Sequence, residues 1–219
     1  FRPNSDFKSI NTFQSLNFNL SDRSKLTTEI TYLEYLAHQA GGLSDRMFEI
    51  APYQSNRERN WFEVKWFLYN LKYLYEISSN SNFSFSFFGL DATRNALGFR
   101  TNRVDQIDFG DERDLIKGRF RNFGFETRYI NNYTVLNKKS YLLLGAKYYN
   151  SFSESTQGPG SASKDANFDF DYLNFPNYVN QSDYSYPNFN LALFGENIFY
   201  LSENFSITPG FRFENINTK

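Results

Sequence analysis

The most constraining feature of this chain is an alternation of apolar and polar residues with a period of two. Phe83, Phe85 and Phe87 alternate with polar neighbours, and the same pattern recurs at residues 16–20, 26–32, 71–77, 123–129 and 205–213. This period is typical of β-strands that have one apolar face. Residues 141–149 and 189–200 also resemble strands, but they are apolar on both faces, so their orientation stays open. The sequence therefore predicts about eight strands and an all-β fold.

The connections between these strands fall into two length classes. Short polar turns are expected at residues 21–24, 78–81, 137–140 and 202–204, and long polar connections at 37–60, 91–119 and 152–187. Short and long connections alternate, which places all turns at one end of an antiparallel sheet and all long loops at the other. Transmembrane β-barrels of the outer membrane sort their connections in this way. The Gly- and Ser-rich stretch at 157–163 is expected to be part of a loop, so no domain boundary is predicted.

Composition narrows the class of protein further. The chain holds 26 Phe and 16 Tyr, yet its mean hydropathy is −0.59 and it has no stretch of roughly 20 apolar residues that a transmembrane helix requires. A membrane barrel explains this combination, because only alternate residues of each strand face lipid. The absence of cysteine excludes disulfides and thiolate chemistry, and the net charge of −1 gives no reason to expect nucleic acid as a partner.

Four segments, taken in order, resemble TonB-dependent receptors, in particular the iron(III) dicitrate transport branch. Residues 32–45 end in Gln-Ala-Gly-Gly-Leu-Ser-Asp, which is similar to the family's Gln-X-Gly-Gly-Leu-(Ser/Thr)-Asp loop. Residues 57–62 match its Arg-X-Arg-Asn-Trp-Phe return into the next strand. The third segment covers 87–99, and the fourth combines 192–199 with 205–214 in a hairpin that recurs across these receptors.

The resemblance implies a 22-stranded barrel in the outer membrane of a Gram-negative bacterium, with an N-terminal plug domain and import powered by the TonB system. This sequence shows no plug domain, no TonB box and no C-terminal strand with a terminal aromatic residue. Residues 1–219 are therefore expected to be an internal part of such a barrel, about eight consecutive strands of it. The implied function is import of a ferric chelate, of siderophore or iron-citrate type, by a protein that is not an enzyme.

Two alternatives stay open at this point. The chain could belong to a structural or adaptor barrel that is held in a larger assembly and whose loops bind other outer-membrane proteins. It could also be a small free-standing barrel of eight strands, in which the first strand pairs with the last. An open sheet with two unpaired edges would contradict the small barrel.

The candidate ligand-binding residues are arginines in the expected loops. A ferric chelate such as ferric citrate is anionic, and guanidinium groups form paired hydrogen bonds with carboxylates. The candidates are Arg57, Arg59, Arg94, Arg100 and Arg103. No catalytic residue, metal site or cofactor is predicted, and the single histidine, His38, is expected to have a structural or surface role.

Aromatic residues gather where one predicted strand leaves the first long connection. Trp61, Phe62, Trp66, Phe67 and Tyr69 are expected to form part of the aromatic girdle at the membrane interface. The charged residues on the polar side of the alternation are expected to face water or the plug; they are Glu29, Glu126, Arg128, Arg212 and Glu214.

Overall fold

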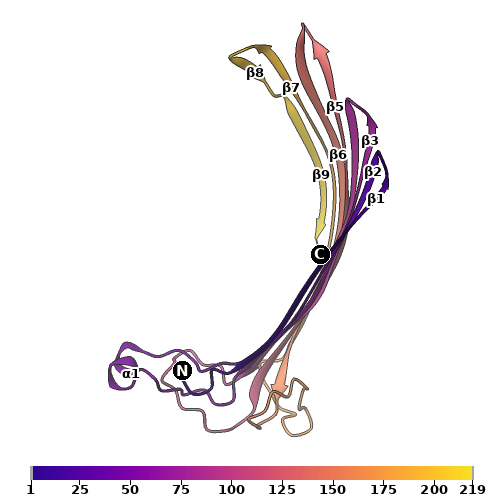
Figure 1. The fold of residues 1–219 in the computed structure, drawn as a ribbon. Coiled ribbons are helices and arrows are strands. Elements are labelled where there is room, and N and C mark those ends of the chain that lie inside the picture. Colours follow the sequence, from indigo (N-terminus) through magenta and orange to yellow (C-terminus); the bar gives the residue numbers. More distant parts are fainter. Residues whose placement is uncertain (1, 219) are drawn as a thin grey trace.

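The computed structural model describes residues 2–218 as one curved antiparallel sheet (Figure 1). Its strands are β1 (Phe7–Ser21), β2 (Ser24–His38), β3 (Trp61–Ser78), β4 (Ser81–Gly98), β5 (Arg113–Val135), β6 (Lys138–Gly160), β7 (Ser182–Ser202), β8 (Phe205–Ile207) and β9 (Gly210–Thr218). Each strand pairs with the next along the chain, except that β9 pairs with β7. The sheet confirms the predicted all-β, transmembrane-barrel fold class.

The last of the eight predicted strands is divided into β8 and β9. Thr208 and Pro209 separate the two pieces, and both pieces pair with β7. Proline has no backbone N–H to donate, so it interrupts a ladder at a sheet edge. The Pro209 carbonyl still accepts a hydrogen bond of 2.9 Å from the backbone N–H of Asn197. The result is a meander of eight strands in which the last strand contains a break.

All the hairpin turns lie at one end of the sheet, and the long loops lie at the other end with the helix α1 (Asp45–Ile50) (Figure 1). Three turns match the prediction, and serine hydroxyls bridge two of them: Ser21 to Ser24 at 2.7 Å and Ser78 to Ser81 at 2.8 Å. The third turn was misplaced, because residues 138–140 belong to β6. The turn is formed by Leu136 and Asn137, whose φ angles of 50° and 61° fit the positive-φ turn that a two-residue hairpin favours.

All three long connections are shorter than predicted, and two of them are much shorter. The loops cover residues 39–60, 99–112 and 161–181, because β4, β5, β6 and β7 continue well past the apolar part of the sheet. In these outer parts of the strands the alternation of apolar and polar residues disappears while the backbone ladder continues, and apolar residues such as Leu97 and Leu115 are buried there. In Figure 1 the loops and α1 bend toward the concave side of the sheet. Among residues 2–218, no helix has the length and apolar character needed to cross a bilayer.

The register shows which side chains of each strand lie on a mostly apolar face of the sheet and which lie on a mostly polar face. One row across β3 to β9 contains Tyr73, Phe85, Thr127, Ala146, Leu193 and Phe213, and we call their side the aromatic face. The neighbouring row on the opposite side contains Lys72, Ser86, Glu126, Lys147, Ala192 and Glu214, and we call that side the polar face. This register orients the segments at 141–149 and 189–200, which the alternation left open. The charged residues expected on the polar side of the strands do lie on the polar face.

The expected aromatic girdle at the start of β3 does not form as one cluster. Trp61, Phe67 and Tyr69 lie on the aromatic face, whereas Phe62 and Trp66 lie on the polar face. The prediction was wrong because adjacent residues of a strand point to opposite sides. Trp61 is also the first residue of β3, next to the loops, where its ring stacks on the His38 ring with the two ring centroids 4.0 Å apart.

The sheet does not close on itself. Within residues 2–218, β1 pairs with β2 alone, and no ladder joins it to β8 or β9. The hypothesis of a small closed barrel of eight strands predicted that pairing, so the open, curved sheet in Figure 1 shows it to be wrong.

Candidate functional site

The three loops are tied together by buried arginines, and Arg57 is the first of them. Its side chain donates to the carbonyl oxygens of Gln106 at 3.0 Å and Val104 at 3.2 Å, and to the hydroxyl of Thr101 at 3.3 Å. The guanidinium carbon also lies 5.2 Å from the ring centre of Phe99. With 5% of the residue exposed, Arg57 holds loop 39–60 against loop 99–112.

Arg59 joins all three loops. Its guanidinium pairs with both carboxylate oxygens of Asp108, one of them at 2.9 Å, and it donates to the carbonyl oxygens of Asp111 and Ala162, both at 2.9 Å. Burial alone would raise the pKa of Asp108, but the hydrogen bonds from Arg59 and from the Gly110 N–H, together with the positive charge, hold that pKa below its ordinary value. The pair is therefore ionised over the whole neutral range.

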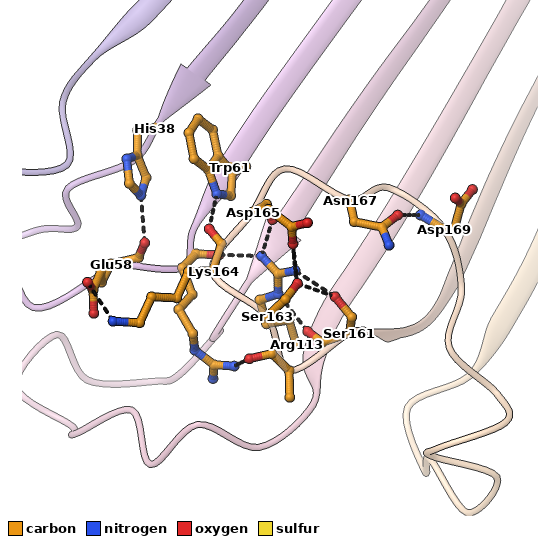
Figure 2. Close-up of polar contacts among 12 residues, drawn as sticks. His38, Glu58, Trp61, Arg113, Ser161, Ser163, Lys164, Asp165, Asn167 and Asp169 are labelled. Atoms are coloured by element: carbon orange, nitrogen blue, oxygen red, sulfur yellow. Dashed lines mark hydrogen bonds and ion pairs between the residues drawn. The ribbon is translucent and has the colours of Figure 1, made fainter.

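Arg113, which the sequence analysis did not single out, is the most buried cation of the loop end, with an exposed fraction of 0% (Figure 2). It donates to the carbonyl oxygens of Ser161 at 2.7 Å, Asp165 at 2.8 Å and Arg59 at 3.0 Å, and to the hydroxyls of Ser161 at 2.9 Å and Ser163 at 3.1 Å. Burial and the neighbouring charge of Arg59 lower the pKa of Arg113 to about 10. Loop 161–181 thus begins by wrapping around one guanidinium.

His38 and Trp61 connect the ends of β2 and β3 to the same loops (Figure 2). The two ring nitrogens of His38 lie 3.1 Å from Asp6 Oδ1 and 2.6 Å from the Glu58 carbonyl oxygen. Trp61 donates through Nε1 to the Lys164 carbonyl at 2.8 Å, and the Lys164 ammonium is 2.8 Å from Glu58 Oε1. We call this set of contacts, together with Arg57, Arg59 and Arg113, the loop clasp.

The remaining arginines of the predicted site lie outside the loop clasp. Arg103 is exposed and forms a paired hydrogen bond with Asp105 at 3.0 and 2.6 Å, and Arg100 is exposed. Arg94 was expected in a loop but lies within β4, with an exposed side chain on the polar face. The structure therefore joins Arg57 and Arg59 in one bonded unit and does not gather the five candidates at a single point.

Arg94 stands in a distinctive part of the polar face, next to the loop end. Toward β5 its row continues through Gly118 and Ser155 to Tyr184, so this flank is small, whereas its neighbour on β3 is Val64. The adjacent row contains Trp66, Ala92, Phe120, Ser153 and Tyr186. Trp66, Tyr184 and Tyr186 are 39%, 55% and 50% exposed. We call Arg94 with Trp66, Phe120, Tyr184 and Tyr186 the Arg94 wall.

Among the aromatic members of this wall, Trp66 was expected in the membrane-interface girdle and the others were not identified from the sequence, whereas the orientation of Arg94 did have a signal. Arg94 has the same even-numbered parity as Ser84 and Ser86, which the alternation already placed on the polar side. Extending that parity to residue 94 predicts its face correctly. Tyr184 and Tyr186 stood in a stretch that was expected to be loop, so no parity could be assigned to them.

A shallow hollow of about 230 Å³ lies at the loop end, and Arg100, Asp108, Asp114 and Tyr178 are among its lining residues. The Tyr178 hydroxyl donates to Asp114 and accepts a hydrogen bond of 3.0 Å from Gln157. Burial and the bond to Asp114 raise the pKa of Tyr178 to about 12. The hydroxyl is therefore a fixed, neutral hydrogen-bonding group beside an exposed arginine.

Comparison with known proteins identifies the fold. No family model matches the sequence, and no curated protein matches it. Among solved structures, the ferric citrate transporter FecA in its unliganded form superposes with a TM-score of 0.80 at 17% identity, over 99% of this chain and 30% of FecA. The ferripyoverdine receptor of Pseudomonas aeruginosa, bound to ferripyoverdine, has a TM-score of 0.75 at 11% identity, over 100% of this chain and 31% of the receptor.

BauA, the ferric preacinetobactin receptor of Acinetobacter baumannii, has a TM-score of 0.73 at 8% identity, over 100% of this chain and 35% of BauA. This chain thus spans about a third of the length of the receptors that it matches. At these identities the likeness establishes the fold, which is that of a portion of an outer-membrane receptor barrel.

Proposed function

We propose that this chain is part of the barrel of a TonB-dependent outer-membrane receptor that imports a ferric chelate into the periplasm. The fold of the chain and the four sequence segments that resemble this family support the proposal. Further strands would pair with the open edges of β1 and of β8 and β9, because unpaired backbone groups are untenable in lipid. A plug domain inside such a barrel would face the charged residues of the polar face and connect the receptor to the TonB system.

The Arg94 wall is the observation that carries the proposal. An exposed guanidinium on the inward-facing side can bind a carboxylate of an anionic chelate through two parallel hydrogen bonds. Gly118 and Ser155 on one flank leave room for a ligand, and the exposed rings of Trp66, Tyr184 and Tyr186 provide apolar surface around it. Ferric citrate is the first ligand to test, since the sequence resembles the iron(III) dicitrate branch.

The five candidate arginines would then contribute in two ways. Arg94 would contact the chelate, while Arg100 and Arg103 would attract it from the loop end. Arg57 and Arg59 have their donors committed within the loop clasp, so they would act by keeping the loops in place beside the wall.

The test is binding and uptake of ferric citrate by the full-length receptor that contains Arg94→Gln. We expect binding to weaken about tenfold, most strongly at low ionic strength, because one charge-assisted pair is lost. Arg119→Gln is the matched control, since Arg119 is equally exposed on β5 but lies on the aromatic face. Equal affinity of Arg94→Gln and the wild type at low salt would refute the proposal.

A role as an adaptor that binds another protein is the second candidate. Large apolar residues of the loops are exposed, among them Ile50 at 72%, Tyr53 at 72% and Phe109 at 83%. Exposed apolar groups on an ordered scaffold are typical of protein-binding surfaces. If this role is correct, Phe109→Asp should release a co-purifying outer-membrane protein and leave chelate binding unchanged; loss of chelate binding alone would favour import.

A further inference from the structure

Polar side chains join the apolar ones on the aromatic face in successive rows as β5, β6 and β7 approach their turns. The row of Tyr129, Leu144 and Gly195 is followed by Asn131, Leu142 and Asn197, and then by Tyr133, Ser140 and Phe199. Beyond these rows, Lys138 pairs with Glu203 in the turns. Tyrosine and amide side chains at such a change mark the boundary between hydrocarbon and headgroups. Asn197 therefore lies at the depth of the membrane interface.

A groove of about 330 Å³ opens on this face at the break between β8 and β9. Leu142, Leu144, Phe199 and Phe211 form its walls, Pro209 its edge, and Asn197 contributes the amide. Gly195 keeps its floor low, because a Cβ there would come within 2.9 Å of both Leu144 and Phe211. The groove is apolar apart from its contacts with Asn197 and the neighbouring Glu196.

The side chain of Asn197 is only partly satisfied. Its Oδ1 accepts a hydrogen bond of 3.0 Å from the Tyr133 hydroxyl, and 9% of the residue is exposed. Its Nδ2 is buried and has no hydrogen-bond partner among residues 2–218. A buried donor without an acceptor is destabilising, and the penalty is larger beside hydrocarbon than beside water. Asn56 and Asn190 also have an unpaired oxygen, but they lie in a loop and on the polar face.

We propose that the groove binds an acyl chain of a glycerophospholipid and that Asn197 Nδ2 donates to the ester carbonyl of that chain. Lipid is the solvent of the aromatic face, and an acyl chain is the apolar part that fits an open groove. The ester carbonyl is the acceptor that a phospholipid carries at the depth of Asn197. Nδ2 is covered in this structure, so the carbonyl reaches it when the side chains that line the groove move apart.

The inference rests on the membrane-spanning fold and is independent of which chelate is carried. Tyr133 has a positioning role in it: by binding Oδ1, its hydroxyl fixes the amide so that Nδ2 is the atom left for the lipid. The groove recognises the lipid by the ester linkage of its acyl chain and not by its headgroup.

The test compares two lipids that differ only at the linkage. The full-length receptor is titrated with diacyl phosphatidylethanolamine and with its dialkyl ether analogue, and bound lipid is counted by native mass spectrometry. The wild type should retain the ester lipid about threefold to tenfold more strongly, as expected for one hydrogen bond. Asn197→Leu should lose this preference and bind both lipids like the ether analogue.

Asn131→Leu is the matched control, because Asn131 lies in the same row, on the other side of Leu142, and does not line the groove. It should keep the ester preference. Equal retention of the two lipids by the wild type would overturn the proposal and assign the Nδ2 donor to water. This outcome is informative even if Asn197→Leu fails to assemble. Chelate binding is measured on the same samples, so failure of the lipid preference is distinguishable from failure of the import function.

Discussion

Arginines of the loop end and arginines of the sheet have opposite surroundings. Arg59 and Arg113 are 5% and 0% exposed, and their donors are used by carbonyl, carboxylate and hydroxyl oxygens of the loops. Arg94 and Arg119 are exposed on opposite faces of β4 and β5. The same side chain is a structural element in one region and a surface group in the other.

The difference follows from how each region satisfies its backbone. In the sheet, neighbouring strands pair the backbone groups, so side chains are free to meet lipid or water. The loops have no ladder, and buried carbonyl oxygens such as those of Ser161 and Asp165 need another donor. A guanidinium has five N–H donors in a fixed plane, which allows one residue to satisfy several carbonyls.

Replacing the buried Arg113 by Leu should have the largest effect of the substitutions that test the contrast between loop and sheet arginines. The carbonyl oxygens of Ser161, Asp165 and Arg59 would lose their donor inside a buried site, which costs on the order of 3 kcal/mol of local stability. Hydrogen exchange of residues 161–165 in the full-length protein should accelerate by about two orders of magnitude. Arg119→Leu, the control on the sheet, should leave that exchange unchanged. Slow exchange in Arg113→Leu would show that the clasp does not hold the loop.

Gly89→Ala tests the sheet in the same way. Tyr69 lies across Gly89 in the register, and a Cβ on Gly89 would come within 2.2 Å of the Tyr69 hydroxyl and 2.6 Å of the Asn122 carbonyl oxygen. The ring can move but the backbone carbonyl cannot, so we expect a loss of about 1–3 kcal/mol in unfolding free energy. Urea unfolding in lipid vesicles measures it. In a Tyr69→Ala background most of the loss should remain, because the carbonyl contact is unchanged; a loss that disappears would assign the strain to the ring.

Acid should weaken the clasp through Asp108. Its pKa is lowered in the folded protein, so the stabilisation is complete above the unfolded value near 4 and is lost as the pH falls through the lowered pKa. Loop exchange should therefore accelerate below about pH 4 in the wild type. Asp108→Asn should remove most of this dependence and make the loops mobile at neutral pH. A wild-type profile that is flat to pH 2 would contradict the role of the pair.

The sequence was sufficient to predict the regular part of the molecule. Alternation in residues 83–87 and 123–129 identified strands and their faces, because a pleated strand with one apolar side has no other pattern. The prediction of strands failed where a strand does not have a single apolar side. Beyond residue 91 of β4 apolar and polar residues no longer alternate, so Arg94 was expected in a loop.

The sequence indicated which types of residue the candidate site contains, but it did not indicate how they are arranged in space. The ligand-binding role expected of the loop arginines stays a prediction, and Arg113 carried no local signal, since its partners in loop 161–181 are 48 to 52 residues away. Such contacts depend on how three loops meet. The break at Pro209, which opens the groove beside Asn197, was visible only as a proline within a strand pattern.

Arg103 is the candidate whose replacement should matter least. Its pairing with Asp105 is fully exposed, and the two residues lie in the same loop, so the pair joins nothing else together. Exposed pairs contribute little, because water and salt screen them and two long side chains lose freedom. Arg103→Gln should leave loop exchange unchanged and reduce the rate of chelate association only at low ionic strength. A loss of equilibrium affinity as large as that of Arg94→Gln would move the ligand contact from the wall to the loop, and would mean that exposure at the loop end, rather than position on the polar face, decides which arginines bind.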